Sequence, residues 1–190
     1  YVEAGAAGTG TSDDPFGMIE EAIYALAGSD GTIYVYGSYE MSTFQCDPWE
    51  GMVTISGVNA DSVLTLAESM GITFNGDITF KDINFSIGSN AHFNPQGTLM
   101  VMDGGEDSYF KSFMHLSMFG NTVVDEADFI VNSGSISRLD FGGGYCTSYA
   151  NGVIGDTDLT INGGSIGTIR ISADRYMDTH TGISIGGNMN

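Results

Sequence analysis

Short runs in which apolar and polar residues alternate fill much of the chain after residue 30. A run in which every second side chain is apolar is typical of a β-strand with one buried face. Glycines and small polar residues separate these runs, which indicates tight turns between many short strands. The strands expected from this pattern include 31–37, 53–56, 63–66, 72–74, 78–80 and 83–87.

A spacing of three to four residues marks one helix near the start of the chain. Its apolar face is formed by Phe16, Ile19, Ala22, Ile23 and Leu26. Asp13-Asp14-Pro15 precedes this face, and Asp and Pro are favoured at the N-cap and at the first helical position. Gly28 is suited to end a helix. The pattern predicts an amphipathic helix over about residues 14–27, with one face covering apolar residues elsewhere.

The first forty residues also resemble a known fold family. The segments are Gly-Thr-Gly-Thr-Ser-Asp-Asp-Pro-Phe (8–16), Ile-Glu-Glu-Ala-Ile (19–23) and Gly-Thr-Ile-Tyr-Val-Tyr-Gly-Ser-Tyr (31–39). Together they resemble the N-terminal cap and first rung of pectate-lyase-like right-handed parallel β-helices, in which an amphipathic helix plugs the open end. The resemblance implies an all-β fold, namely a right-handed parallel β-helix (β-solenoid) with an N-terminal capping α-helix. It is a signal of fold and says little about function.

The last third of the chain contains an internal repeat with an offset of 30 residues. Residues 128–137 align with 158–167, and the identical pairs are Asp128/Asp158, Asn132/Asn162, Gly134/Gly164, Ser135/Ser165 and Ile136/Ile166. A period of this length indicates a solenoid, in which each unit buries its apolar face against its neighbours. On such a fold the two asparagines are expected to form a hydrogen-bonded ladder.

The repeats also resemble glycine-rich, adhesin-like repeats of large secreted surface proteins of anaerobic bacteria. The expectation is one β-helix domain over residues 1–190, with a cap in 1–30 and rungs in 31–190. The chain opens without Met and its last repeat is cut, so we expect a fragment of a longer repeat protein.

Charge narrows the range of partners. Five Lys and Arg residues against 24 Asp and Glu give a formal net charge of −19. This balance excludes the basic surface that nucleic acids and anionic membranes require. No apolar run approaches about 18 residues, so no membrane insertion is expected. Cations and neutral glycans remain compatible with the charge. The two cysteines, Cys46 and Cys146, either pair or stay as free thiols.

The sequence lacks the complete sets of catalytic motifs that pectate-lyase-like enzymes carry. Lyases of this fold use a basic side chain with Ca²⁺, and the hydrolases use paired carboxylates. Lys81 and Lys111 lie 30 residues apart, and Asp103-Gly-Gly-Glu-Asp107 is an acidic cluster. We interpret both as solvated surface groups, because lone charged pairs and acidic glycine turns are common.

Two kinds of binding site are predicted. Glu126 and Asp128 recur as Asp156 and Asp158, and stacked carboxylates would repel unless they point to water or a Ca²⁺ ion bridges them. Ca²⁺ is therefore the candidate cofactor. Aromatic rings that could stack on a sugar are Trp49 with Tyr36 and Tyr39, or Tyr145 with Tyr149. The competing interpretation is that these rings pack in the core or in turns.

The function expected from these features is a non-catalytic β-solenoid module of a secreted or cell-surface bacterial protein. It would act in adhesion or glycan binding, with a glycan or cell-envelope polymer as partner, or as a structural stalk. The alternative is a divergent polysaccharide lyase or glycoside hydrolase. A third hypothesis is a self-assembling extracellular fibre or surface-layer subunit, in which cut strand edges lead to head-to-tail self-association.

Overall fold

The computed structural model describes most of the N-terminal half of the chain and parts of the C-terminal half. The described residues are 1–26, 28–41, 44–45, 48–68, 70–88, 92–95, 98–104, 116–118, 127–136, 139–141 and 159–171. This part of the chain is mostly β-strand with one short helix, and its strand pairings are parallel. The predicted all-β class is therefore confirmed.

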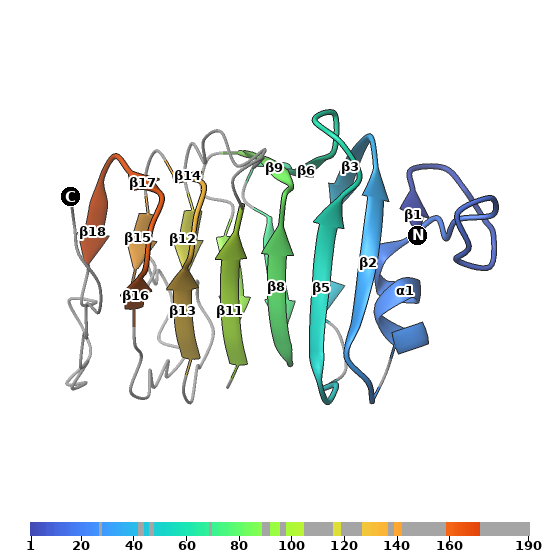
Figure 1. The fold of residues 1–190 in the computed structure, drawn as a ribbon, viewed down its shortest axis with the longest axis horizontal. Coiled ribbons are helices and arrows are strands. Elements are labelled where there is room, and N and C mark those ends of the chain that lie inside the picture. Colours follow the sequence, from blue (N-terminus) through green and yellow to red (C-terminus); the bar gives the residue numbers. More distant parts are fainter. Residues whose placement is uncertain are drawn as a thin grey trace.

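The strands of the described residues form long rows in which neighbours come from successive repeats (Figure 1). The largest sheet has the order β1 (Val2–Glu3), β2 (Gly31–Tyr36), β5 (Met52–Gly57), β8 (Asp77–Lys81), β11 (Thr98–Asp103), β13 (Ala127–Val131) and β16 (Leu159–Ile161). A second sheet contains β4 (Phe44–Gln45), β7 (Gly71–Phe74), β10 (His92–Pro95), β12 (Leu116–Met118), β15 (Leu139–Phe141) and β18 (Ile169–Ile171).

Two smaller sheets complete the set of described strands. One contains β3 (Ser38–Met41), β6 (Val63–Leu66) and β9 (Asn84–Ile87), and the other pairs β14 (Ser135–Ile136) with β17 (Ser165–Ile166). The chain thus passes from the first sheet to the smaller sheets and then to the second sheet before it returns to the first.

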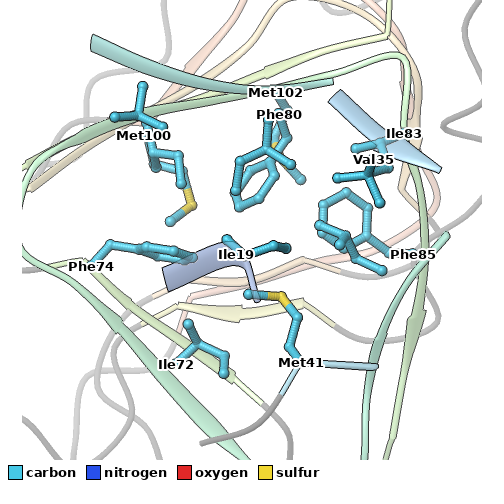
Figure 2. Close-up of a cluster of buried hydrophobic side chains, with 14 of the residues drawn as sticks. Ile19, Val35, Met41, Ile72, Phe74, Phe80, Ile83, Phe85, Met100 and Met102 are labelled. Atoms are coloured by element: carbon cyan, nitrogen blue, oxygen red, sulfur yellow. The ribbon is translucent and has the colours of Figure 1, made fainter. Parts of the chain in front are cut away.

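Register explains why the core is continuous from one repeat to the next. Along the largest sheet, buried positions pair with buried positions: Ile33, Ile55, Phe80, Met102, Val131 and Ile161 follow one another in register. Side chains alternate between faces of a strand, so one register keeps the whole apolar row inside. Figure 2 shows side chains of the three larger sheets pointing into the shared interior, including Phe80, Phe74 and Phe85.

The helix α1 spans Ile19–Leu26 and lies beside β2 at one end of the row of strands (Figure 1). Ile19 and Ile23 are buried and Leu26 is partly buried against the core, which confirms the predicted apolar face. Gly28 follows with a φ of 83°, and the Ser29 N–H donates to the Leu26 carbonyl, so the predicted end is also confirmed.

The predicted start of the helix near Asp14 is wrong. The Asp14 carboxylate accepts hydrogen bonds from the Thr9 N–H (3.0 Å) and the Thr9 hydroxyl (2.9 Å). Phe16 forms a β-bridge with Val2, and the Glu3 N–H donates to the Phe16 carbonyl. These contacts hold residues 13–16 in a loop against β1, so Asp14 cannot cap a helix. The helix α1 begins at Ile19, five residues after Asp14.

A buried serine fixes the connection between β5 and β6, and its removal supplies a first prediction. The Ser62 hydroxyl is fully buried, donates to the Val35 carbonyl (2.8 Å) and accepts from the Val58 (3.0 Å) and Asn59 (3.3 Å) N–H groups. We expect Ser62→Ala to lower the free energy of unfolding by about 1 to 3 kcal/mol, because it removes the three hydrogen bonds that the buried hydroxyl makes.

Urea unfolding monitored by circular dichroism measures this loss. Ser29→Ala is the matched control, since the Ser29 hydroxyl is exposed and donates only to the Leu26 carbonyl (3.1 Å). We expect the control to change stability by no more than about 0.5 kcal/mol. Equal unfolding midpoints for Ser62→Ala and the parent protein would show that this hydroxyl does not stabilise the connection.

Candidate functional site

A row of polar side chains joins the C-terminal repeats on the outside of the fold. The Asn162 side-chain amide donates to the Asn132 amide oxygen at 2.9 Å, and the Ser165 hydroxyl donates to the Ser135 hydroxyl at 3.0 Å. The partners in each pair are 30 residues apart. The predicted asparagine ladder and the 30-residue offset are both confirmed.

The same row continues one repeat toward the N-terminus. The Ser133 hydroxyl donates to an Asp103 carboxylate oxygen at 2.9 Å, again over 30 residues. Gly134 and Gly164 have φ angles of 103° and 86°, so the turn is the same in both copies. A Cβ on Gly164 would lie 2.7 Å from the Gly134 carbonyl oxygen, which explains why the repeat keeps glycine here. We call Asp103, Ser133 and the Asn132/Asn162 and Ser135/Ser165 pairs the polar ladder.

Trp49, a predicted sugar-stacking residue, is used to cover a corner of the core. Its ring packs edge-on against Phe74, with centroids 6.4 Å apart, and over Gly76, where a Cβ would collide with the indole. Its Nε1–H donates to the Asp77 carbonyl at 3.3 Å. These contacts occupy both the ring and its polar atom, so the core-packing interpretation describes Trp49 better than a sugar platform does.

Tyr39 was predicted to act with Trp49, and its position corrects that prediction. The side chain is only 6% exposed, and its hydroxyl accepts a hydrogen bond from the Ile19 N–H at 3.1 Å. Burial raises the pKa of Tyr39, the hydrogen bond from Ile19 opposes this shift, and the charges of Glu20 and Glu21 add to it. Tyr39 therefore supports the first turn of α1, where an unpaired N–H needs an acceptor, and offers no ring face to a ligand.

Tyr36 instead belongs to a group of tyrosines on the outer face of β1 and β2. The Tyr1 ring stacks on Tyr34 (centroids 5.1 Å, interplanar angle 26°) and on Tyr36 (5.6 Å, 17°). We call Tyr1, Tyr34 and Tyr36 the tyrosine stack. The parallel pairing of Val2 with Val35 places Tyr1 next to Tyr34, and Glu3 pairs with Tyr36. Tyr1 and Tyr34 were not among the predicted site residues, although the two-residue spacing of Tyr34 and Tyr36 indicated a common face.

The predicted calcium ligands are described only in part. Asp128 lies in β13, half-buried and paired in register with Leu99. Glu126, Asp156 and Asp158 lie outside the described residues, as do Tyr145 and Tyr149 of the second aromatic pair. Within the described ranges, no group of three or more His, Cys, Asp or Glu side chains is placed to hold a metal ion. Calcium binding at these acids stays a prediction.

The basic and acidic groups considered for catalysis are described only in part. Lys81 is exposed on β8 and pairs in register with Asp103 of β11, which accepts the Ser133 hydrogen bond. Lys111, Asp107, Cys46 and Cys146 lie outside the described residues. The buried polar side chains of the described part are Ser56 and Ser62. Its interior is thus an apolar core.

Comparison with known proteins adds no relative. The chain matches no protein-family model, no curated protein and no solved structure. The resemblances to pectate-lyase-like proteins and to adhesin-like repeats therefore stay predictions. In the described part of the chain, no helix is long and apolar enough to span a membrane.

Proposed function

We propose that the chain is a right-handed parallel β-helix, capped by α1, and that it serves as a non-catalytic stalk module of a secreted or cell-surface bacterial protein. The observation that carries this proposal is the polar ladder, in which Asn162 and Ser165 bond to the same residue types 30 positions earlier. Side chains that bond to their own copies in the next repeat favour a fold that grows by adding identical units.

The pattern of sheets supports this proposal. Each strand of the largest sheet pairs in parallel with a strand of the next repeat, and the smaller sheets follow the same order. In a stack of this kind each repeat contacts only its neighbours, so stability is close to a sum of nearest-neighbour terms. The number of repeats then sets the length without changing the cross-section, which is the property that a stalk needs.

The composition supports a place outside the cell. Only two lysines occur in 190 residues, and 24 acidic residues keep the chain strongly anionic. Such a charge favours solubility and discourages contact with anionic surfaces. The alternative, a divergent polysaccharide lyase or glycoside hydrolase, has no specific observation in its favour among the described residues.

Lengthening the repeat region tests the stalk directly. Three extra copies of residues 128–157 inserted after residue 157 should lengthen the particle by about 14 Å, three times the strand spacing, with an unchanged cross-section. Small-angle X-ray scattering measures both dimensions. The control is an insertion of equal length made of Gly and Ser, which forms a flexible coil and adds no β-strand signal in circular dichroism. A wider particle, or one that loses its cooperative unfolding, would contradict the proposal.

A further inference from the structure

We propose that the tyrosine stack is a binding platform for a neutral sugar ring, a function that the stalk by itself does not need. The stack lies on the outer face of β1 and β2, close to the end of the molecule that α1 covers (Figure 1). Tyr34 is 39% exposed, and Tyr1 and Tyr36 are half-buried. The three rings therefore remain partly open to solvent while they are held against one another.

Attachment of β1 to the rest of the fold does not depend on these rings. Val2 is fully buried and pairs with Val35, and the Phe16 N–H donates to the Tyr1 carbonyl at 2.9 Å. The main-chain nitrogen of Tyr1 donates to the Gly10 carbonyl oxygen at 2.8 Å. Because the backbone and Val2 already fix β1, the outward rings are available for another role.

The geometry of the rings favours a flat ligand. Tyr34 and Tyr36 are inclined by only 26° and 17° to Tyr1, so both rings of β2 stack on the same partner ring. An aromatic cage for a cation would instead surround its ligand with rings at steep angles. The parts of the three rings that stay exposed therefore lie together as one aromatic surface, and the apolar C–H face of a pyranose can pack on a surface of this kind.

Polar groups around the stack suit hydroxyl groups rather than charge. Glu3 is exposed and pairs in register with Tyr36, where its carboxylate is a hydrogen-bond acceptor and would repel an acidic sugar. The tyrosine hydroxyls can donate and accept. The net charge of −19 acts in the same direction as Glu3 against anionic polymers. The class of ligand inferred is therefore an uncharged saccharide.

Binding of soluble oligosaccharides to the full chain tests the inference. The probes are cello-, xylo-, manno- and laminari-oligosaccharides, with oligogalacturonate as the acidic comparator and choline as the cationic one. Saturation-transfer NMR and isothermal titration calorimetry measure binding. We expect at least one neutral oligosaccharide to bind, with a dissociation constant of about 1 mM for a single stacked ring, and no binding of oligogalacturonate.

Three variants at two tyrosine positions locate the site. Tyr34→Ala should weaken binding by about tenfold or more, whereas Tyr34→Phe should retain most of it because the ring is kept. Tyr24→Ala is the matched control, since Tyr24 is 52% exposed but lies on α1 outside the stack, and it should bind like the parent chain. Unfolding curves of the variants confirm that each remains folded at the assay temperature.

Four results would overturn the inference: no binding of any neutral probe, preferential binding of choline or of oligogalacturonate, unchanged binding by Tyr34→Ala, or equal losses in Tyr34→Ala and Tyr24→Ala. None of them bears on the stalk, which the insertion of repeats tests independently. Likewise, a failure of the insertion experiment leaves the sugar-binding test intact, because the stack lies in β1 and β2 and not in the repeated segment.

Discussion

Ile23→Asp is expected to lower the free energy of unfolding by about 3 to 5 kcal/mol, one of the two largest effects predicted for this protein. Ile23 is 2% exposed and belongs to the apolar face by which α1 packs against β2 and the core. An aspartate at this position would place a carboxylate among apolar side chains without a partner. A buried carboxylate of this kind either disrupts the packing around it or takes up a proton, and both lower the free energy of unfolding.

Urea unfolding of the parent and variant chains measures this effect, and the neighbouring residue provides the control. Tyr24 lies on the opposite side of α1 and is 52% exposed. Tyr24→Asp introduces the same charge into solvent and should change stability by no more than about 0.5 kcal/mol. If the two variants unfolded at the same urea concentration, α1 would not be packed on the core as described.

Phe80→Ala is expected to cost about 3 to 5 kcal/mol of unfolding free energy. Phe80 of β8 is fully buried and meets Phe74 of β7 edge-on at 5.9 Å and Phe85 of β9 at 5.1 Å. The three rings come from three different sheets, and Figure 2 shows them across the shared interior. Truncation would leave a cavity at the point where these sheets contact one another, and close packing elsewhere limits its collapse.

A more conservative substitution of Phe80 shows how much of the destabilisation comes from the lost side-chain volume. Phe80→Leu keeps an apolar side chain and should cost less than about 1.5 kcal/mol. Thermal and urea unfolding of both variants measure the difference. If Phe80→Ala were as stable as Phe80→Leu, the contact between the three sheets would not depend on this ring, and the packing in Figure 2 would be contradicted.

Local pattern was sufficient for several strands and for their buried sides, whereas β3, β10 and β11 were not among the predicted runs. Val53 and Ile55 alternate with polar residues, as do Ile78 and Phe80, and all four are buried. Alternation predicts these strands because one face of each strand packs in the core and the other contacts solvent, so apolar and polar residues alternate with a period of two. The 30-residue offset also predicted the pairing of Asn132 with Asn162, because identical units that stack bring identical residues together.

The first residue of α1 could not be predicted from the local sequence pattern. Asp13-Asp14-Pro15 is a good beginning for a helix when it is considered alone. In the fold, Asp14 bonds to Thr9 and Phe16 bridges to Val2, and these contacts with the preceding segment replace the cap. A local preference of about 1 kcal/mol is easily overridden when the same residues gain several tertiary contacts.

By itself, then, the sequence determined several of the strands and their buried faces, the repeat and the apolar face of the helix, because each depends on spacing along the chain. Which tyrosines share a surface was decided only by the tertiary structure. Gly37, with a φ of 60°, separates β2 from β3, so Tyr36 lies outside while Tyr39 lies inside beneath α1. Tyr1 reaches Tyr34 only because β1 pairs with β2, across more than thirty residues of chain. Such contacts depend on which distant segments of the chain pack together, and the spacing of residues within one segment does not determine this.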